Sequence, residues 1–134
     1  MKKNNVNDRL LLTELLSPLE FLLRLSGMAY DKYMVNKIYL HALNIRKANE
    51  MVYQLLLDKI HFIPAEIQND CIALLNHYDG WMLQFKDEEQ KRKPSLKDEF
   101  IFYRIDDQMA FPRLSEQRIF ELIKKINKQK NKRS

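Results

Sequence analysis

Glycine is scarce in this sequence, since Gly27 and Gly80 are the only two among 134 residues. A phosphate-binding loop needs several glycines close together, so the sequence excludes nucleotide binding through such a loop. The chain also has only four prolines, which leaves little material for the many tight turns of a β-sandwich or β-barrel. Both shortages favour a helical protein.

Cysteine is rarer still, and the single Cys71 cannot form a disulfide within the chain. Small secreted domains are commonly cross-linked by disulfides, so a reducing compartment fits this sequence better. In the leucine-rich residues 10–25, charged side chains at Glu14, Glu20 and Arg24 prevent an apolar run of the roughly 18 to 20 residues that a membrane span requires. We therefore expect a cytoplasmic protein that does not interact with a membrane.

Patterns typical of catalytic and metal sites are also missing. A di-iron bundle uses paired Glu-x-x-His motifs, whereas Asp58 and His61 form a single Asp-x-x-His here. Cys71 falls on the apolar face of a predicted helix, where a free cysteine usually behaves as a small buried hydrophobic residue. We expect no catalytic residues, no metal site and no cofactor, and the sequence favours a protein that is not an enzyme.

Apolar residues recur with helical spacing through most of the chain. The pattern predicts helices over about residues 8–26, 31–61 and 64–89, and from Ser115 onward. Pro18 interrupts the first segment, which is either two short helices or one kinked helix, and Gly27 is expected to end it. Because the link near Pro64 is short, the two long helices should pack antiparallel. The predicted fold is mainly α, an antiparallel helical bundle of four to five helices.

A short β-hairpin is predicted near residues 100–111. Residues 100–105 are rich in aromatic and β-branched side chains, a turn can form at Asp106 and Asp107, and Pro112 closes the return strand. Since both alternating faces of residues 100–105 are mostly apolar, something must cover them. The helical body and a second chain are both candidates for the cover.

Asn49 occupies a core position in the heptad pattern of residues 31–61. A buried asparagine can fix helix register or oligomeric state. Alternatively Asn49 lies at the edge of the core and Ala48 takes the inward place.

A candidate protein interface combines a strip of residues 31–61 with the aromatic segment. Tyrosine and arginine are enriched at the centres of protein interfaces, although tyrosines at a domain boundary also rest half-wet on their own domain. The candidate residues are Tyr39, Arg46, Tyr53, Phe100, Phe102 and Tyr103.

The net charge of +5 is confined to the end of the sequence. Residues 1–123 hold 17 basic and 18 acidic side chains, whereas no acid follows Glu121. We expect one helical domain over residues 1–123 and a partly disordered basic tail over residues 124–134. The tail either contacts phosphates or another acidic surface, or complements a helix dipole and keeps the chain in solution. The absence of an aromatic residue in the tail favours the second interpretation. The candidate contacts are Lys124, Lys125, Lys128, Lys130, Lys132 and Arg133.

Three functions follow from these patterns. The first is a protein-protein interaction subunit or adaptor, which binds another protein or a second copy of itself. The second is an accessory protein that binds nucleic acid through the basic tail. The third is a small enzyme whose site the sequence does not reveal.

Overall fold

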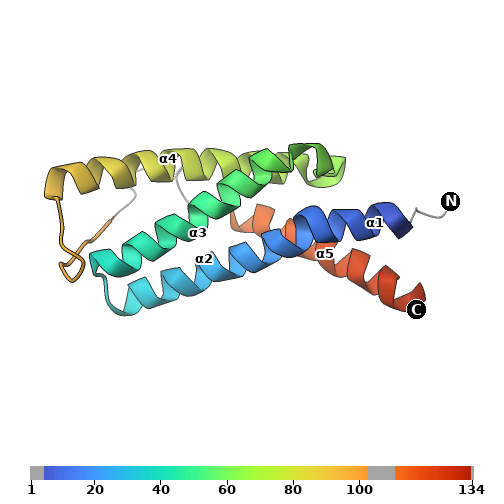
Figure 1. The fold of residues 1–134 in the computed structure, drawn as a ribbon, viewed down its shortest axis with the longest axis horizontal. Coiled ribbons are helices and arrows are strands. Elements are labelled where there is room, and N and C mark those ends of the chain that lie inside the picture. Colours follow the sequence, from blue (N-terminus) through green and yellow to red (C-terminus); the bar gives the residue numbers. More distant parts are fainter. Residues whose placement is uncertain (1–4, 103–110, 134) are drawn as a thin grey trace.

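The computed structural model describes residues 5–102 and 111–133, and it describes side chains over residues 7–102 and 111–129. This part of the chain is mainly helical and contains no sheet, so the predicted helical fold is confirmed (Figure 1). The first rod joins α1 (Asn5–Leu11), a π-helical turn η1 (Leu12–Leu16) and α2 (Ser17–Val35). Then follow α3 (Tyr39–Asp58), the short 3₁₀ helices η2 (Ile60–Phe62) and η3 (Ala65–Ile67), α4 (Gln68–Arg92) and α5 (Arg113–Arg133).

The first rod passes Pro18 without a break because a π-turn precedes the proline. The Ser17 N–H bonds to the Leu12 carbonyl, five residues back, and Pro18 has no N–H to place in the ladder. The helix also continues past Gly27, so the predicted end at this glycine is wrong. The next helix begins at Tyr39 and not near residue 31. Tyr33 is buried in the core, and its packing holds the last two turns of α2 in helical form.

The helices run back and forth along the long axis of the molecule. Figure 1 shows α2 and α3 side by side with opposite chain directions, and α4 then runs back along α3. The antiparallel arrangement of the two long predicted helices is therefore observed, although α3 packs more extensively against α2 than against α4. α5 packs on α4 and lies below it, toward the α1 end of the first rod.

The buried side chains form two clusters of different composition. The aliphatic core contains residues from the first rod, α3, α4 and α5. α5 contributes to this cluster and not to the other. The aromatic core lies around Tyr33, Trp81, Phe85 and Phe100. Members of the aliphatic core are Leu12, Leu15, Leu16, Leu19, Leu22, Leu23, Val52, Leu56, Ile67, Cys71, Leu74, Tyr78, Ile119, Leu122, Ile123 and Ile126.

Asn49 and Ala48 lie on α3 between the stretches that enter the two cores. Ala42 and Ile45 belong to the aromatic core, whereas Val52 belongs to the aliphatic core. Both Asn49 and Ala48 are buried, so neither displaces the other to the edge. The Ser26 hydroxyl donates to the Asn49 Oδ1 at 2.7 Å. The buried amide is thereby paired with α2 and fixes how α2 and α3 align.

The predicted β-hairpin near residues 100–111 is not supported. Residues 100–102 form no strand, and residues 103–110 lie outside the described part of the chain. An isolated antiparallel bridge joins Glu99 to Ile38, and the Phe100 N–H donates to the Lys37 carbonyl at 2.8 Å. Phe100 has no exposed surface because its ring enters the aromatic core. The aromatic character that suggested a strand therefore serves packing between helices.

Candidate functional site

The predicted interface residues Tyr39 and Arg46 face their own chain. The Tyr39 hydroxyl donates to the Glu89 carboxylate on α4, and Arg46 Nη1 donates to the same Glu89 Oε2 at 2.9 Å. The Arg46 guanidinium also lies 5.4 Å from the centre of the Phe85 ring. Burial, followed by the hydrogen bond and the charge of Glu89, raises the pKa of the Tyr39 hydroxyl. These contacts join α3 to α4.

The other predicted interface residues are also engaged within the chain where they are described. A hydrogen bond to Asp79 on α4 is the main cause of the raised pKa of Tyr53. The Tyr33 hydroxyl donates to the Phe100 carbonyl at 2.7 Å and accepts the Phe102 N–H at 3.0 Å. The helical body is therefore the cover of Phe100. Tyr103 lies outside the described residues.

Three of the predicted basic contacts, unlike the predicted interface residues, face away from the rest of the chain. Lys124, Lys125 and Lys128 are exposed on α5, opposite the face that enters the aliphatic core. Within the part of the chain that the structure describes, no ion pair joins any of these lysines to an acid. Their charges are therefore available to an external anion.

α5 continues as a helix across the expected boundary between domain and tail, and Ile126 is buried beyond it. The division at residues 123 and 124 stays a prediction. The side chains of Lys130, Lys132 and Arg133 lie outside the described residues, although the backbone of α5 extends through them.

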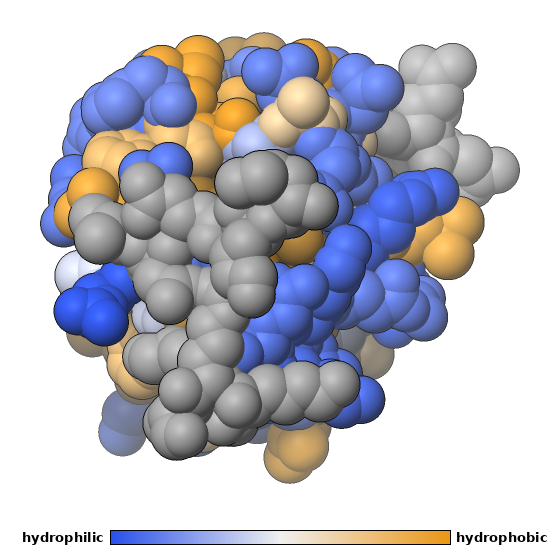
Figure 2. All heavy atoms as spheres, turned by 90° about the vertical axis from the view of Figure 1, so that its right-hand side faces the viewer, coloured by the Kyte–Doolittle hydropathy of each residue, from blue (hydrophilic) through white to orange (hydrophobic). Residues whose placement is uncertain are grey.

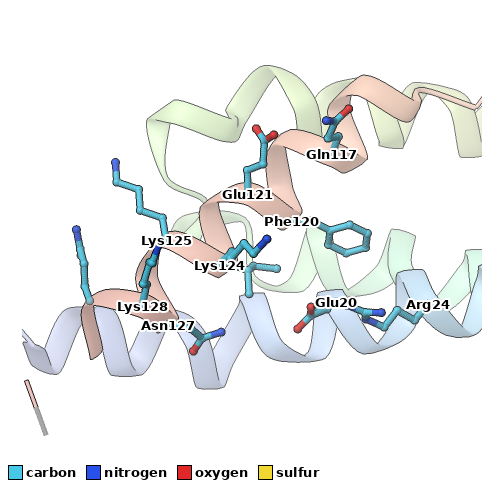
Figure 3. Close-up of a pocket in the computed structure, with 11 residues that line it drawn as sticks. Glu20, Arg24, Gln117, Phe120, Glu121, Lys124, Lys125, Asn127 and Lys128 are labelled. Atoms are coloured by element: carbon cyan, nitrogen blue, oxygen red, sulfur yellow. Dashed lines mark hydrogen bonds and ion pairs between the residues drawn. The ribbon is translucent and has the colours of Figure 1, made fainter. Parts of the chain in front are cut away.

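An open groove between α5 and α2 lies beside the three lysines (Figure 3). Phe120 enters it from α5, and the Arg24 guanidinium of α2 lies 5.5 Å from the centre of the Phe120 ring. The sequence interpretation missed both residues because it considered only the tail from residue 124. The spacing of Phe120 and Lys124 by one helical turn is the signal that could have revealed Phe120, whereas no sequence signal places Arg24 beside it. The groove is lined by Glu20, Arg24, Gln117, Phe120, Glu121, Ile123, Lys124, Lys125, Asn127, Lys128 and Gln129.

Positive charge dominates the groove and its surroundings despite two acids in its lining. Glu20 is paired with Arg24 at 3.1 Å, and Glu121 lies at the start of the lysine-rich half of α5. Over its whole length α5 contains eight basic and two acidic residues. Figure 2 shows the end of the molecule toward which α5 runs, where hydrophilic groups cover a broad area beside separate hydrophobic ones. An anionic ligand would experience a net attraction here.

Cys71 and the possible metal ligands are further reactive groups among the residues described. Cys71 is buried, and desolvation, with a smaller effect of Asp70, raises its thiol pKa to about 12; such a thiol is a poor nucleophile at neutral pH. Among the residues described, no group of three or more histidine, cysteine or acidic side chains could hold a metal ion. None of the described helices combines the length and apolar character of a membrane span.

Comparisons with known proteins add no family to this description. No protein-family model, no curated protein and no solved structure matches the chain.

Proposed function

We propose that this protein binds single-stranded nucleic acid, without catalytic activity, in the groove between α2 and α5. The observation that carries the proposal is the continuity between three exposed lysines and the pair formed by Phe120 and Arg24. Proteins that bind single strands combine a cationic track for the phosphates with aromatic or arginine planes on which bases stack. The groove holds both kinds of group.

The shape and lining of the groove fit a strand better than a compact small molecule. The groove is open along α5, and the thirteen residues from Gln117 to Gln129 extend over about 18 Å of helix. Small-molecule sites are usually enclosed and mostly apolar. Amide groups of Gln117, Asn127 and Gln129 can donate and accept hydrogen bonds at base edges.

The direct test is fluorescence anisotropy with a short labelled single-stranded oligonucleotide. We expect binding that weakens as salt rises and that exceeds binding of the corresponding duplex. Phe120→Leu should lower the affinity about fivefold or more, because a stacking plane is lost. Tyr30→Leu is the matched control, since Tyr30 is exposed on α2 and does not line the groove.

Competition with polyglutamate separates this proposal from a role in binding acidic proteins. If polyglutamate displaces the oligonucleotide as well as unlabelled oligonucleotide of equal charge does, the surface recognises charge alone and the proposal fails. It also fails if Phe120→Leu and Tyr30→Leu bind with the affinity of the unaltered protein.

A protein-interaction subunit is the second candidate function. Its support is the apolar side chains exposed on α2, among them Phe21, Met28 and Val35, because contiguous exposed apolar groups commonly mark interaction surfaces. Retention of a specific partner in a pull-down that Met28→Glu abolishes would favour it, and retention unchanged by Met28→Glu would count against this surface. A cytoplasmic location is part of both proposals, since the lone cysteine fits a reducing compartment.

A further inference from the structure

α2 carries a second apolar face opposite the one that enters the aliphatic core. The side chains of Phe21, Leu25, Met28 and Val35 are 65%, 37%, 61% and 89% exposed. The core face of the same helix contains Leu19, Leu22, Leu23 and Tyr33. None of the four belongs to either buried cluster, and Phe21, Met28 and Val35 are more than half exposed, so their apolar character needs another explanation.

The outer face has the spacing of a helix-pairing seam. Positions 18, 21, 25, 28, 32 and 35 alternate steps of three and four residues, which is the heptad spacing of a coiled coil. Pro18, the four exposed apolar residues and Lys32 occupy them. We call this set the outer seam of α2. It extends over about 26 Å of helix.

We propose that a second copy of this chain docks on the outer seam with its own α2 antiparallel to the first. A parallel pair would place Lys32 against the second copy's Lys32, and like charges opposed in an interface are unfavourable. An antiparallel pair places Leu25 against the second copy's Met28, and the same contact recurs by two-fold symmetry. It also places Lys32 over the second copy's Phe21, where a cation–π contact can form.

Charges beside the seam support the same register. Arg24 and Asp31 each precede a seam position, Leu25 and Lys32, and so lie along the same edge of α2. In an antiparallel pair of helices, residues that directly precede such seam positions lie opposite the equivalent residues of the other helix. In the register that aligns Leu25 with the second copy's Met28, each Arg24 lies opposite the other copy's Asp31. Within one chain the exposed Arg24 bonds to Glu20 and lies over the Phe120 ring, and its guanidinium has further N–H donors for the second copy's Asp31.

Light scattering coupled to size-exclusion chromatography tests the association over a series of concentrations. We expect a mass that rises from the 16.2 kDa of one chain to twice that value. Met28→Glu should weaken the association about tenfold or more, because it buries an unpaired carboxylate beside Leu25. Leu83→Glu is the matched control, since Leu83 is exposed on α4 away from the seam.

Charge reversal tests the register without altering the groove. Asp31→Lys should weaken the association about fivefold, because two attractive pairs per dimer become repulsive. Glu66→Lys, at an exposed acid of η3, should leave it unchanged. A mass of one chain at every concentration overturns the proposal, as do equal effects of the seam variants and their controls.

Disulfide trapping tests the direction of the pairing. An equimolar mixture of Leu25→Cys and Met28→Cys chains is oxidised, and mass spectrometry resolves the mixed dimer from the two homodimers. The antiparallel seam predicts that the mixed disulfide forms fastest, whereas faster formation of both homodimeric disulfides would show parallel pairing and overturn the proposal. Native Cys71 is buried and does not need to be removed. The result does not depend on nucleic acid binding, so the two proposals can fail separately.

Discussion

The aromatic core and the outer face of α5 use charged and polar side chains in opposite ways. Around the aromatic core, the polar groups bond to partners in the same chain. Tyr33 donates to the Phe100 carbonyl, and Tyr39 and Arg46 donate to the Glu89 carboxylate. On α5, Lys124 and Lys125 lie in the open, without an acidic partner among the described residues. Groups of the first kind stabilise the fold, and groups of the second kind are available to bind a ligand.

The largest effect that this comparison predicts is on stability at the aromatic core. Phe100→Ala should lower the free energy of unfolding by about 3 to 5 kcal/mol, because a fully buried ring leaves a cavity between α3 and α4. Leu83→Ala, which truncates an exposed side chain on α4 away from the outer seam, should change it by about 0.5 kcal/mol or less. Urea unfolding followed by circular dichroism measures both. Similar losses in the two variants would show that Phe100 does not support the core.

The boundary between the two cores should show a smaller effect. Asn49→Ala should lower the free energy of unfolding by about 1 to 2 kcal/mol, because Ser26 loses its acceptor and α2 its alignment with α3. In a double-mutant cycle with Ser26→Ala, the second substitution should lower the free energy of unfolding only slightly once the first has removed the hydrogen bond. Strict additivity of the two losses would mean that the hydrogen bond contributes nothing.

A stabilising substitution is predicted on α2, the helix that enters both cores. A Cβ added at Gly27 would meet nothing within 4 Å, and the residue lies inside a helix. Gly27→Ala should therefore raise the free energy of unfolding by about 0.5 to 1 kcal/mol. Thermal unfolding provides the comparison, and a lower melting temperature would show that the space around Gly27 is needed.

The smallest effect concerns Glu116, where α5 enters the aliphatic core. Desolvation raises the pKa of Glu116, against a smaller opposing effect of Arg113 and Arg24. The ionised carboxylate is thus disfavoured in the folded state, and its stabilising protonated form is lost as pH rises through the raised pKa. Glu116→Gln should raise the melting temperature at neutral pH and change it less at about pH 3. Glu66→Gln, at an exposed acid, is the control. A larger rise in the melting temperature of Glu116→Gln at about pH 3 than at neutral pH would contradict the raised pKa of Glu116.

Periodicity identified the elements that pack by repeated apolar residues. Leu74 and Phe85 lie on the predicted core face of α4, and that helix ends at Arg92, where Lys93 adopts the left-handed conformation before Pro94. The break near residue 37 was misplaced because it depends on contacts distant in sequence. The Lys37 carbonyl accepts a hydrogen bond from the Phe100 N–H. The first two amides of α3 donate to the carbonyls of Asp98 and Leu96. No local pattern encodes these bonds.

The candidate site was predictable only in part. The positive charge of the last part of α5 was predictable, because the sequence has no acid after Glu121. The position of Arg24 beside Phe120 was not predictable, because it depends on how α2 packs against α5. The sequence placed Tyr39, Arg46 and Tyr53 on one strip and left open whether the strip binds another protein or rests on its own domain. Its partners Glu89 and Asp79 lie on α4, and sequence spacing alone could not decide between them and a second protein.

The salt dependence of oligonucleotide binding tests most directly whether the free lysines of α5 hold phosphates. We compare the unaltered protein with a variant in which Lys124, Lys125 and Lys128 are glutamine, and with a control in which the exposed Lys47, Lys86 and Lys97 are glutamine. Loss of three phosphate contacts should reduce the slope of log affinity against log salt by about 2 in the first variant. The control should keep the slope of the unaltered protein. Equal slopes in all three proteins, or equal reductions in both variants, would contradict a phosphate track on α5.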